Sequence, residues 1–264
     1  MSVRGFTNSR PLLLTLEIGV PVALLAWWWF ASASSTNPFF PSLQKIVTEF
    51  GKLWLFDHFL SDIVPSMSNF VIGFAIACVA GVLLGTLLGL VPPLNWLLGP
   101  IIQFIRAVPA VALLPIFIAM LGFGNEVRLF IIALAALFPV LISTIDGIRG
   151  TDALLVDMSK VYRFSRIERL WFVYLRSASP QIFSGMLVSL QVAFIVMITS
   201  EMLGSARGIG AMTLMAQKSF DILGMWAGIV LLGILGYLVN LLFSMFRRRA
   251  LAWHLGAQRA QASN

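Results

Sequence analysis

The sequence predicts an all-α, polytopic membrane protein, and three observations lead to this fold class. Hydrophobic residues make up 59% of the 264 residues and charged residues only 11%, against roughly 25% charged residues in soluble proteins. The mean hydropathy is +0.93. The basic residues lie between long apolar stretches rather than on one face or among interleaved aromatic residues. The net charge of +7 is therefore interpreted as topological anchoring in a lipid bilayer, and nucleic acid is not expected as a partner.

About six apolar stretches approach the ~20 residues that an α-helix needs to cross ~30 Å of hydrocarbon. They cover about residues 12–33, 68–91, 101–122, 127–148, 181–203 and 223–246. The first is too long for the apolar region of a signal peptide and has no clear cleavage site, so we expect it to remain as a helix. The whole chain, 1–264, is expected to form one transmembrane domain.

The positions of Lys and Arg predict the orientation, because short loops rich in positive charge stay in the cytoplasm. With the N-terminus inside, the cytoplasmic side holds Arg4, Arg10, Arg149, Lys160, Arg163, Arg166, Arg169, Arg176, Arg247, Arg248, Arg249 and Arg259. The outer side then holds Lys45, Lys52, Arg128, Arg207 and Lys218. Both termini are therefore predicted to be cytoplasmic.

Residues 42–56, between the first two spans, are predicted to form an amphipathic helix on the outer side. Lys45, Glu49 and Lys52 mark its polar face. Apolar residues recur at helical spacing on the other face: Leu43, Ile46, Val47, Phe50, Leu53 and Trp54. Such a helix lies along the membrane surface or caps the bundle, and a dedicated docking role is the less favoured interpretation.

The second span carries a small residue at every fourth position: Gly73, Ala77, Gly81, Gly85 and Gly89. Small residues let another helix approach closely, and such packing contacts hold helices together in lipid. We name these five residues the small-residue ridge and predict that it forms a helix–helix interface. The sequence leaves open whether the partner helix belongs to the same chain or to a second copy.

Arg106 and Glu201 are candidate residues of a translocation pathway. Arg106 lies near the predicted cytoplasmic end of the third span, which Pro109 and Pro115 interrupt. An ionisable residue in a span usually faces a cavity, where a guanidinium would favour an anionic solute. The alternative for Arg106 is a side chain that extends back to the inner headgroups. Glu201, near the outer end of the fifth span, either contributes to an outer gate or caps the bundle through a hydrogen bond.

Motifs of several enzyme classes are absent from the sequence. None of the four lysines closes a G-x-x-x-x-G-K-[ST] phosphate loop, so ATP binding by that route is not expected. His58 and His254 lie in separate connections, and Cys78 is the only cysteine, so no metal site or disulfide is expected. A nucleophile elbow of the G-x-S-x-G type is also absent.

The connection between the fourth and fifth spans is the most informative segment. Basic residues are concentrated in it: Lys160, Arg163, Arg166, Arg169 and Arg176. It cannot lie in hydrocarbon, where a central Arg or Lys costs roughly 2.5–3.5 kcal/mol. It is also too long to be a tight link between two helices. We predict that it projects into the cytoplasm and is bound there by another protein.

This segment resembles the EAA loop of the inner-membrane permease subunits of binding-protein-dependent ABC importers, of approximate form E-A-A-x-x-x-G followed by I-x-L-P. Asp157-Met158-Ser159 align with the E-A-A element, Arg163 with the glycine, and Tyr174-Leu175-Arg176 with the segment that ends in proline. Further segments across the chain resemble the nitrate, sulfonate and taurine branch of that family: Phe39-Phe40-Pro41-Ser42, Arg106-Ala107-Val108-Pro109 with Leu113-Leu114-Pro115, Gly122-Phe123-Gly124, and Glu201-Met202-Leu203-Gly204 with Gly208-Ile209-Gly210.

The resemblance implies the type I ABC importer permease fold, in the bacterial inner membrane. The implied partners are a second permease copy in a homodimer, two cytoplasmic ATPase subunits, a solute-binding protein and the lipid bilayer. The chain itself would be no enzyme and would bind no cofactor or metal, because ATP and Mg²⁺ would bind to the partner ATPase. The implied solute is a small organic or inorganic anion of the sulfonate, taurine or nitrate class.

In that family the EAA loop folds as short coupling helices that dock into the ATPase. The resemblance gives this role to a segment of about 157–176, and within it to Asp157, Ser159, Lys160, Arg163, Phe164, Ser165 and Arg166. Arg163 replaces a glycine, which is permissive for tight turns. The replacement predicts either a coupling helix that continues without a bend or an altered contact with the ATPase.

Other functions remain as alternatives. Related permeases carry thiamine precursors or aromatic acids. An ion-coupled secondary transporter would need acidic residues near the midplane, and no predicted span holds one there. A membrane-embedded enzyme would need polar catalytic residues clustered at one depth, and the sequence offers none. ATPase subunits that copurify in fixed proportion would favour the importer over both.

Overall fold

The computed structural model describes the backbone of residues 10–252 and the side chains of residues 19–252. Within this range all regular structure is helical, which confirms the all-α prediction. The expectations for Arg4, Arg259, His254 and both chain ends concern residues outside the described range.

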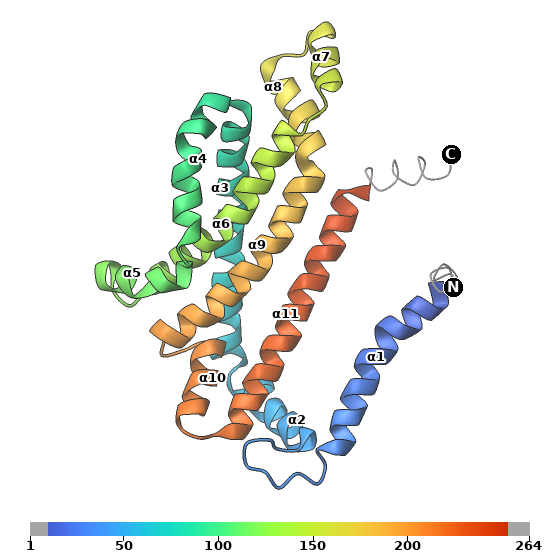
Figure 1. Ribbon diagram of the computed structural model, residues 1–264. Coiled ribbons are helices and arrows are strands. Elements are labelled where there is room, and N and C mark those ends of the chain that lie inside the picture. The colour runs from blue at the N-terminus through green and yellow to red at the C-terminus, as the bar shows by residue number, and fades with distance from the viewer. Residues whose placement is uncertain (1–9, 253–264) are drawn as a thin grey trace.

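The helices follow one another along the chain in a single bundle (Figure 1). Their bounds are α1 (Arg10–Ala31), α2 (Leu43–Lys52), α3 (Val64–Leu90), α4 (Pro92–Ala107), α5 (Leu114–Leu121), α6 (Asn125–Arg149), α7 (Ala153–Val161), α8 (Arg166–Glu168), α9 (Leu175–Gly204), α10 (Ile209–Lys218) and α11 (Ile222–Ala250). Short helical turns of other types connect them at Leu53–Asp57, Phe59–Ile63, Ala110–Leu113 and Arg169–Tyr174.

Four helical stretches in the described part of the chain are long and apolar enough to cross a membrane: Phe59–Leu90, Asn125–Arg149, Arg166–Gly204 and Ile222–Ala250. A fifth crossing results if α4 and the helical segment after it form one broken span. Gly19–Ala31, within α1, is apolar but shorter. A crossing by the first predicted span, and with it a total of six, stays a prediction.

The third predicted span, 101–122, is interrupted near Pro109 as the sequence predicts, but its start at residue 101 is wrong. Helix α4 already begins at Pro92, and the segments Pro92–Ala107 and Ala110–Leu121 meet at a bend of 80°. Pro109 disfavours the helical conformation for the residue before it, and Val108 is extended, with φ −80° and ψ 121°, so α4 ends there. Pro115 then lies in the first turn of α5, where its missing N–H would have no helical partner anyway.

The small-residue ridge of α3 packs against α6 of the same chain, which answers the question that the sequence leaves open. All five ridge residues are buried. A Cβ atom built on any of its four glycines would lie 2.6–2.8 Å from a side chain of α6: Ile132, Val140, Thr144 or Ile148. The backbone of α3 therefore lies directly against α6 along most of their shared length.

Helix α9 packs on α6 and completes the core. Ser189 donates a 2.6 Å hydrogen bond from its hydroxyl to the carbonyl of Ala136, one turn before Pro139 inside α6. Gly185 lies close to Pro139, since a Cβ atom built on it would be 2.7 Å from the Pro139 carbonyl oxygen. The carbonyl groups of Ala136 and Pro139 are thus hydrogen-bonded or packed inside the bundle.

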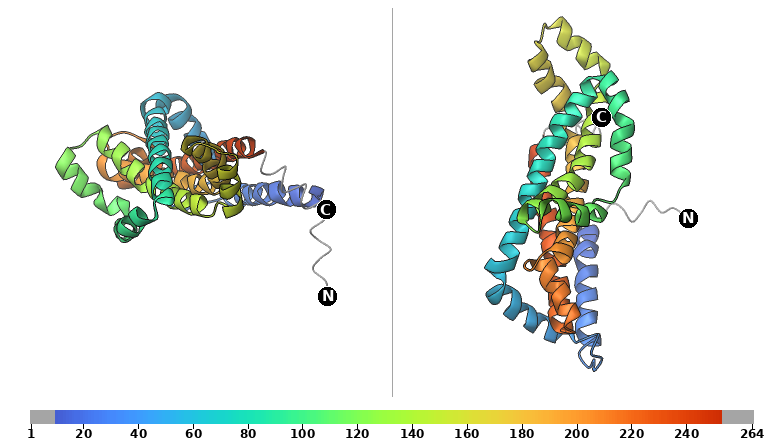
Figure 2. Two further views of the ribbon diagram at one scale, coloured as in Figure 1. Left: turned by 90° about the horizontal axis from the view of Figure 1, so that it is seen from above. Right: turned by 90° about the vertical axis from the view of Figure 1, so that its left-hand side faces the viewer.

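The remaining helices lie at the two ends of the core or alongside it. In Figure 1, α7 and α8 project from one end, whereas α2 and α10 lie at the opposite end. Helix α11 runs alongside the core from the α10 end toward the α7 end, and α1 lies at the side of the bundle. Trp28 of α1 contacts Trp226 of α11, with ring centroids 6.1 Å apart. Figure 2 shows the elongated shape of the molecule from two further directions, with α5 projecting sideways.

Candidate functional site

A cavity of about 450 Å³ lies at the break between α4 and α5, against α6 and α9. We name it the central cavity. Its walls are mostly apolar: Val108, Pro109, Ala110, Ala135, Phe138, Pro139, Ile142, Ser143, Val188, Val192 and Val196. Among the described residues, Arg106 is the only charged one that lines it. A single guanidinium group in apolar surroundings acts on any solute there with little competition from other charges.

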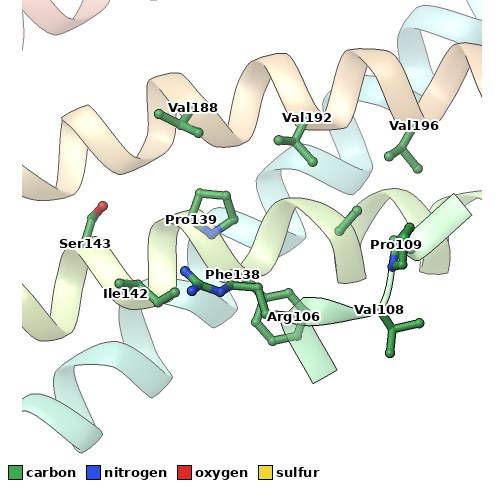
Figure 3. Close-up of a pocket in the computed structure, with 12 residues that line it drawn as sticks. Arg106, Val108, Pro109, Phe138, Pro139, Ile142, Ser143, Val188, Val192 and Val196 are labelled. Atoms are coloured by element: carbon green, nitrogen blue, oxygen red, sulfur yellow. The ribbon is translucent and has the colours of Figure 1, made fainter. Parts of the chain in front are cut away.

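Arg106 lies in the last turn of α4, directly before the break. Its guanidinium donates a 2.8 Å hydrogen bond to Oε1 of Gln103. Figure 3 shows the Arg106 side chain beside Phe138 and Ile142 of α6. The predicted position near the cytoplasmic end of a span is wrong, because α4 starts at Pro92 and Arg106 lies at the other end of that helix. The broken helix, rather than a span terminus, positions this charge.

Glu201 lies in the last turn of α9, and only 2% of its surface is exposed. Its Oε2 accepts a 2.9 Å hydrogen bond from the backbone N–H of Gly210, in the first turn of α10. Of the two interpretations of Glu201, the capping hydrogen bond is therefore present in the structure. A role in an outer gate remains untested.

Two other acceptors hold the start of α10 from the α3 side. The Oδ1 atom of Asp62 accepts a 2.7 Å hydrogen bond from the N–H of Gly208, and the Ser66 hydroxyl accepts one of 3.2 Å from the N–H of Ile209. These N–H groups have no partner within the helix, so side chains of α9 and of the α3 segment replace it. Hydrogen bonds thus fix the start of α10 to α9 and to the segment around the start of α3.

The predicted coupling segment begins earlier than expected, with α7 at Ala153. Asp152 caps this helix, since its Oδ1 accepts a 2.9 Å hydrogen bond from the N–H of Leu154. Asp157 and Lys160 form an ion pair of 2.7 Å whose side chains are 67% and 56% exposed, so it contributes little to stability. Ser159 is buried and donates a 2.6 Å hydrogen bond to the carbonyl of Val156.

Arg163 adopts the left-handed conformation that glycine favours, with φ 57°. The N–H of Phe164 donates to the carbonyl of Ser159, and the N–H of Arg163 to that of Lys160, both at 2.9 Å. This pair of bonds is the Schellman motif, which ends helices. The expectation that the helix continues without a bend is therefore wrong: the backbone hydrogen bonds impose the turn, although arginine is less suited to it than glycine.

The chain resumes as α8 after this turn. Ser165 caps α8: its N–H donates to Oε2 of Glu168 at 2.7 Å, and its hydroxyl accepts from the N–H of Glu168 at 3.2 Å. This reciprocal pair is a capping box. Arg166, in the first turn of α8, is exposed. The capping box and the Schellman motif together define a helix–turn–helix shape between Ala153 and Glu168.

The helix–turn–helix segment and the helical turn after it, Arg169–Tyr174, expose large apolar side chains that the sequence did not indicate. They are Val161 (79% exposed), Tyr162 (71%), Ile167 (70%) and Trp171 (63%). A groove of about 440 Å³ lies beside them, lined by Leu155, Met158, Ser159, Tyr162, Phe164, Phe172, Val173, Arg176 and Ser177. Apolar residues within a strongly charged segment are the signal that could have identified this surface.

The candidate residues therefore fall into three places. Asp157, Ser159, Lys160, Arg163, Phe164, Ser165 and Arg166 lie together in α7, α8 and the turn between them. Arg106 lines the central cavity, and Glu201 lines a different cavity at the α10 end. The apolar lining of the central cavity had no signal in the sequence, because similar residues fill every span.

A model of the family described as "Binding-protein-dependent transport system inner membrane component" matches residues 77–251. A Bacillus subtilis permease protein named for aliphatic sulfonates transport is 30% identical over 236 residues, covering 89% of this chain and 86% of its own length. The taurine transport system permease protein of Escherichia coli is 29% identical, with coverage of 91% and 90%. The nitrate import permease protein of a Synechocystis strain is 27% identical, with coverage of 87% and 86%.

The fold is similar to solved structures as well. A chain from inward-facing structures of the MetNI methionine ABC transporter superposes with a TM-score of 0.61 at 17% identity, covering 71% of this chain and 94% of the other. An amino acid ABC transporter chain superposes with a TM-score of 0.57 at 15% identity, covering 78% and 96%. At these identities the likeness concerns the fold alone.

Proposed function

The chain belongs to the inner membrane components of binding-protein-dependent transport systems, and on this premise we propose that it carries small oxyanions of the sulfonate, taurine and nitrate class into the cell. It is a multi-pass permease subunit of an ABC importer in the inner membrane, and it is not itself the ATPase. The family implies an ATPase and a solute-binding protein as partners. In the proposal, ATP and Mg²⁺ bind to the partner ATPase.

The observation that carries the choice of solute is Arg106 in the central cavity. Its planar guanidinium offers paired donors that match the oxygens of sulfonate, nitrate or carboxylate. The apolar walls formed by α6 and α9 strengthen that attraction relative to water. Relatives named for aliphatic sulfonates, taurine, nitrate and bicarbonate support the same class of solute.

The proposal includes a second copy of this chain. One copy has four or five helices of membrane length in its described part, and its central cavity is not enclosed. Arg106 is exposed, and Val188 on the α9 wall is 52% exposed. A second copy facing α6 and α9 would enclose the cavity and remove these groups from lipid. Glu201, at the α10 end, would then lie near the outer entrance of the shared pathway.

The proposal assigns α7 and α8 to the ATPase. The exposed side chains Val161, Tyr162 and Ile167 would fill an apolar cleft on that subunit, and Arg163 and Arg166 would supply polar contacts at its rim. Helix α7 follows α6 and α8 leads into α9, the two helices that line the central cavity. Closure of the ATPase dimer would therefore shift the populations of inward-open and outward-open states.

Removal of the Arg106 charge tests the choice of solute. Arg106→Ala should reduce uptake of radiolabelled taurine by about tenfold or more, because a charge-assisted hydrogen bond contributes roughly 1.5–3 kcal/mol. Arg106→Lys should retain part of the activity. Lys45→Ala, which removes an exposed cation from α2, serves as the matched control. Copurification of the ATPase subunits should be the same in all variants. Uptake that is unchanged in Arg106→Ala would contradict the proposed role of this residue.

Cysteine labelling tests the proposed orientation and the ATPase contact together. In a Cys78→Ser background, Arg166→Cys reports on α8 and Lys52→Cys on α2, at the opposite end of the bundle. We expect an impermeant maleimide to label Lys52→Cys in intact spheroplasts and Arg166→Cys only in inverted vesicles. The ATPase should protect Arg166→Cys alone. Labelling of Arg166→Cys in spheroplasts would place α8 outside and contradict the assignment.

A further inference from the structure

A second cavity, of about 420 Å³, lies at the α10 end of the core. We name it the outer cavity. The start of α3 with the segment before it, the first turn of α6, the end of α9 and the loop before α10 all contribute to it. Its lining is Ser61, Pro65, Ser66, Asn69, Arg128, Glu201, Ser205, Ala206, Arg207 and Gly208. It shares no residue with the central cavity, whose lining is mostly apolar.

The charged groups of the outer cavity are two guanidinium groups, Arg128 and Arg207, and one carboxylate, Glu201. One oxygen of this carboxylate is already occupied, because Oε2 accepts the hydrogen bond from Gly210 at 2.9 Å. The neighbouring Asp62 is also occupied: it accepts hydrogen bonds from the N–H of Gly208 at 2.7 Å and from the Ser61 hydroxyl at 2.6 Å. The acidic groups are thus engaged in holding α10, and of the two guanidinium groups Arg128 also attracts the Glu201 carboxylate.

Arg128 lines this cavity and has one donor without a partner among the described residues. Its Nε is fully buried and has no hydrogen-bond partner among the described residues. Buried polar atoms in proteins are nearly always hydrogen-bonded, so an unpaired one next to a cavity indicates an absent acceptor. Arg207 lies in the loop before α10 and is exposed, which places the second guanidinium where the cavity meets solvent.

We propose that the outer cavity is a binding site for one small oxyanion, held by the guanidinium groups of Arg128 and Arg207. The paired donors of a guanidinium fit the oxygens of a sulfonate or nitrate group. The choice of ligand rests on the proposed function, because a permease for oxyanions would meet its solute first at this end of the bundle. The outer cavity then holds an anion before it reaches Arg106.

The alternative is that Arg128 only balances the charge of Glu201. The two readings differ in ligand binding, which can be measured on the purified permease–ATPase complex without ATP or binding protein. Methanesulfonate and nitrate are titrated by calorimetry, with methylammonium as the cationic control. The titrations use an Arg106→Gln background, so that the central cavity does not contribute.

Arg128→Gln should raise the Kd for both anions by about tenfold or more, since hydrogen bonds to charged groups contribute roughly 1.5–3 kcal/mol. Arg207→Gln should raise it by a smaller factor because that side chain is exposed. Lys218→Gln, which removes an exposed cation from the other end of α10, should leave it unchanged. An unchanged Kd in Arg128→Gln, or equal binding of methylammonium, would overturn the proposal.

The site remains testable if one variant fails to assemble. If Arg128→Gln fails to assemble, Arg207→Gln and Arg128→Lys decide, because the first is an exposed loop position and the second keeps the charge without the paired donors. An unchanged Kd in both would refute the site.

Two outcomes separate this inference from the proposed function. If the importer carries no anion but anion binding still depends on Arg128, the site stands and the proposed solute is wrong. If the importer carries anions but anion binding does not depend on Arg128, the site is refuted and the proposed solute stands.

Discussion

Gly85 of α3 lies so close to Thr144 of α6 that a Cβ atom on Gly85 would be 2.6 Å from the Thr144 Cβ and 2.8 Å from the Leu141 carbonyl oxygen. Neither neighbour is the end of a flexible side chain, so α3 and α6 would have to move apart to accept even a methyl group. The contact belongs to the α3–α6 interface, against which α9 packs.

Gly85→Ala should therefore destabilise the protein by about 1–3 kcal/mol, the usual cost of overpacking a tight interface. The measurement is the thermal transition of the purified permease in detergent. Gly233→Ala in α11 is the matched control, because a Cβ atom there meets nothing within 4 Å. Equal transition temperatures for the two variants would mean that α3 and α6 are not packed as described.

The turn at Arg163 should become more stable when arginine is replaced by glycine. Glycine adopts φ 57° without the steric cost that other residues pay, so Arg163→Gly should stabilise the segment by up to about 1 kcal/mol. Arg163→Val should weaken it, since a β-branched residue is poorly suited to this conformation. Hydrogen exchange at the amides of Arg163 and Phe164 reports the change. Slower exchange in Arg163→Val than in wild type would contradict the assignment.

The start of α10 should be sensitive to the residue at position 208. Gly208 has φ 117°, and a Cβ atom on it would lie 2.6 Å from the carboxyl carbon of Glu201. Gly208→Ala should therefore release α10 from α9 and expose the N–H of Gly210 to hydrogen exchange. Gly51→Ala, in α2, is the control, since nothing lies within 4 Å of its Cβ position. Retained protection of Gly210 in Gly208→Ala would show that Glu201 does not hold α10.

Asn69 and Asn125 should be energetically coupled. Their side-chain amides exchange two hydrogen bonds, of 2.5 Å and 2.8 Å, between α3 and the first residue of α6. In a double-mutant cycle with Asn69→Ala and Asn125→Ala, we expect a coupling energy of about 0.6 kcal/mol and at most about 1.7 kcal/mol, the range measured for polar contacts between membrane helices. A coupling energy of zero would mean that the pair is not formed in the bilayer.

The sequence predicted the parts of the fold that depend on local spacing. Gly73 and Gly81 recur on one helical face, and that spacing alone predicts a tight helix interface. Pro109 and Pro115 also predicted an interruption of the third span, but not the bend of 80° after Ala107, because a proline in a span either kinks the helix or ends it. The residue before Pro109 and its neighbours decide between these outcomes through packing that the sequence does not reveal.

Some features of the candidate site could likewise be predicted from the sequence, and others could not. Arg106 was identified from its charge within an apolar stretch, but its depth depended on where α4 begins, which is set by Pro92. The turn at Arg163 could not be anticipated, because two backbone hydrogen bonds outweigh the conformational preference of the side chain. Arg128 was counted only as an outward-facing charge, since its position in a cavity depends on helices that are distant in sequence.

The close contact along the small-residue ridge also has a mechanical meaning. With no layer of long side chains between them, α3 and α6 cannot slide or rotate against each other without steric overlap, so they move as one rigid body. Helix α7 follows the end of α6 after a short connection, so a displacement of α7 would tilt α3 and α6 together. Sliding would be confined to softer contacts such as that of Phe183 with Phe243 and Phe246 of α11, where rings can change rotamers.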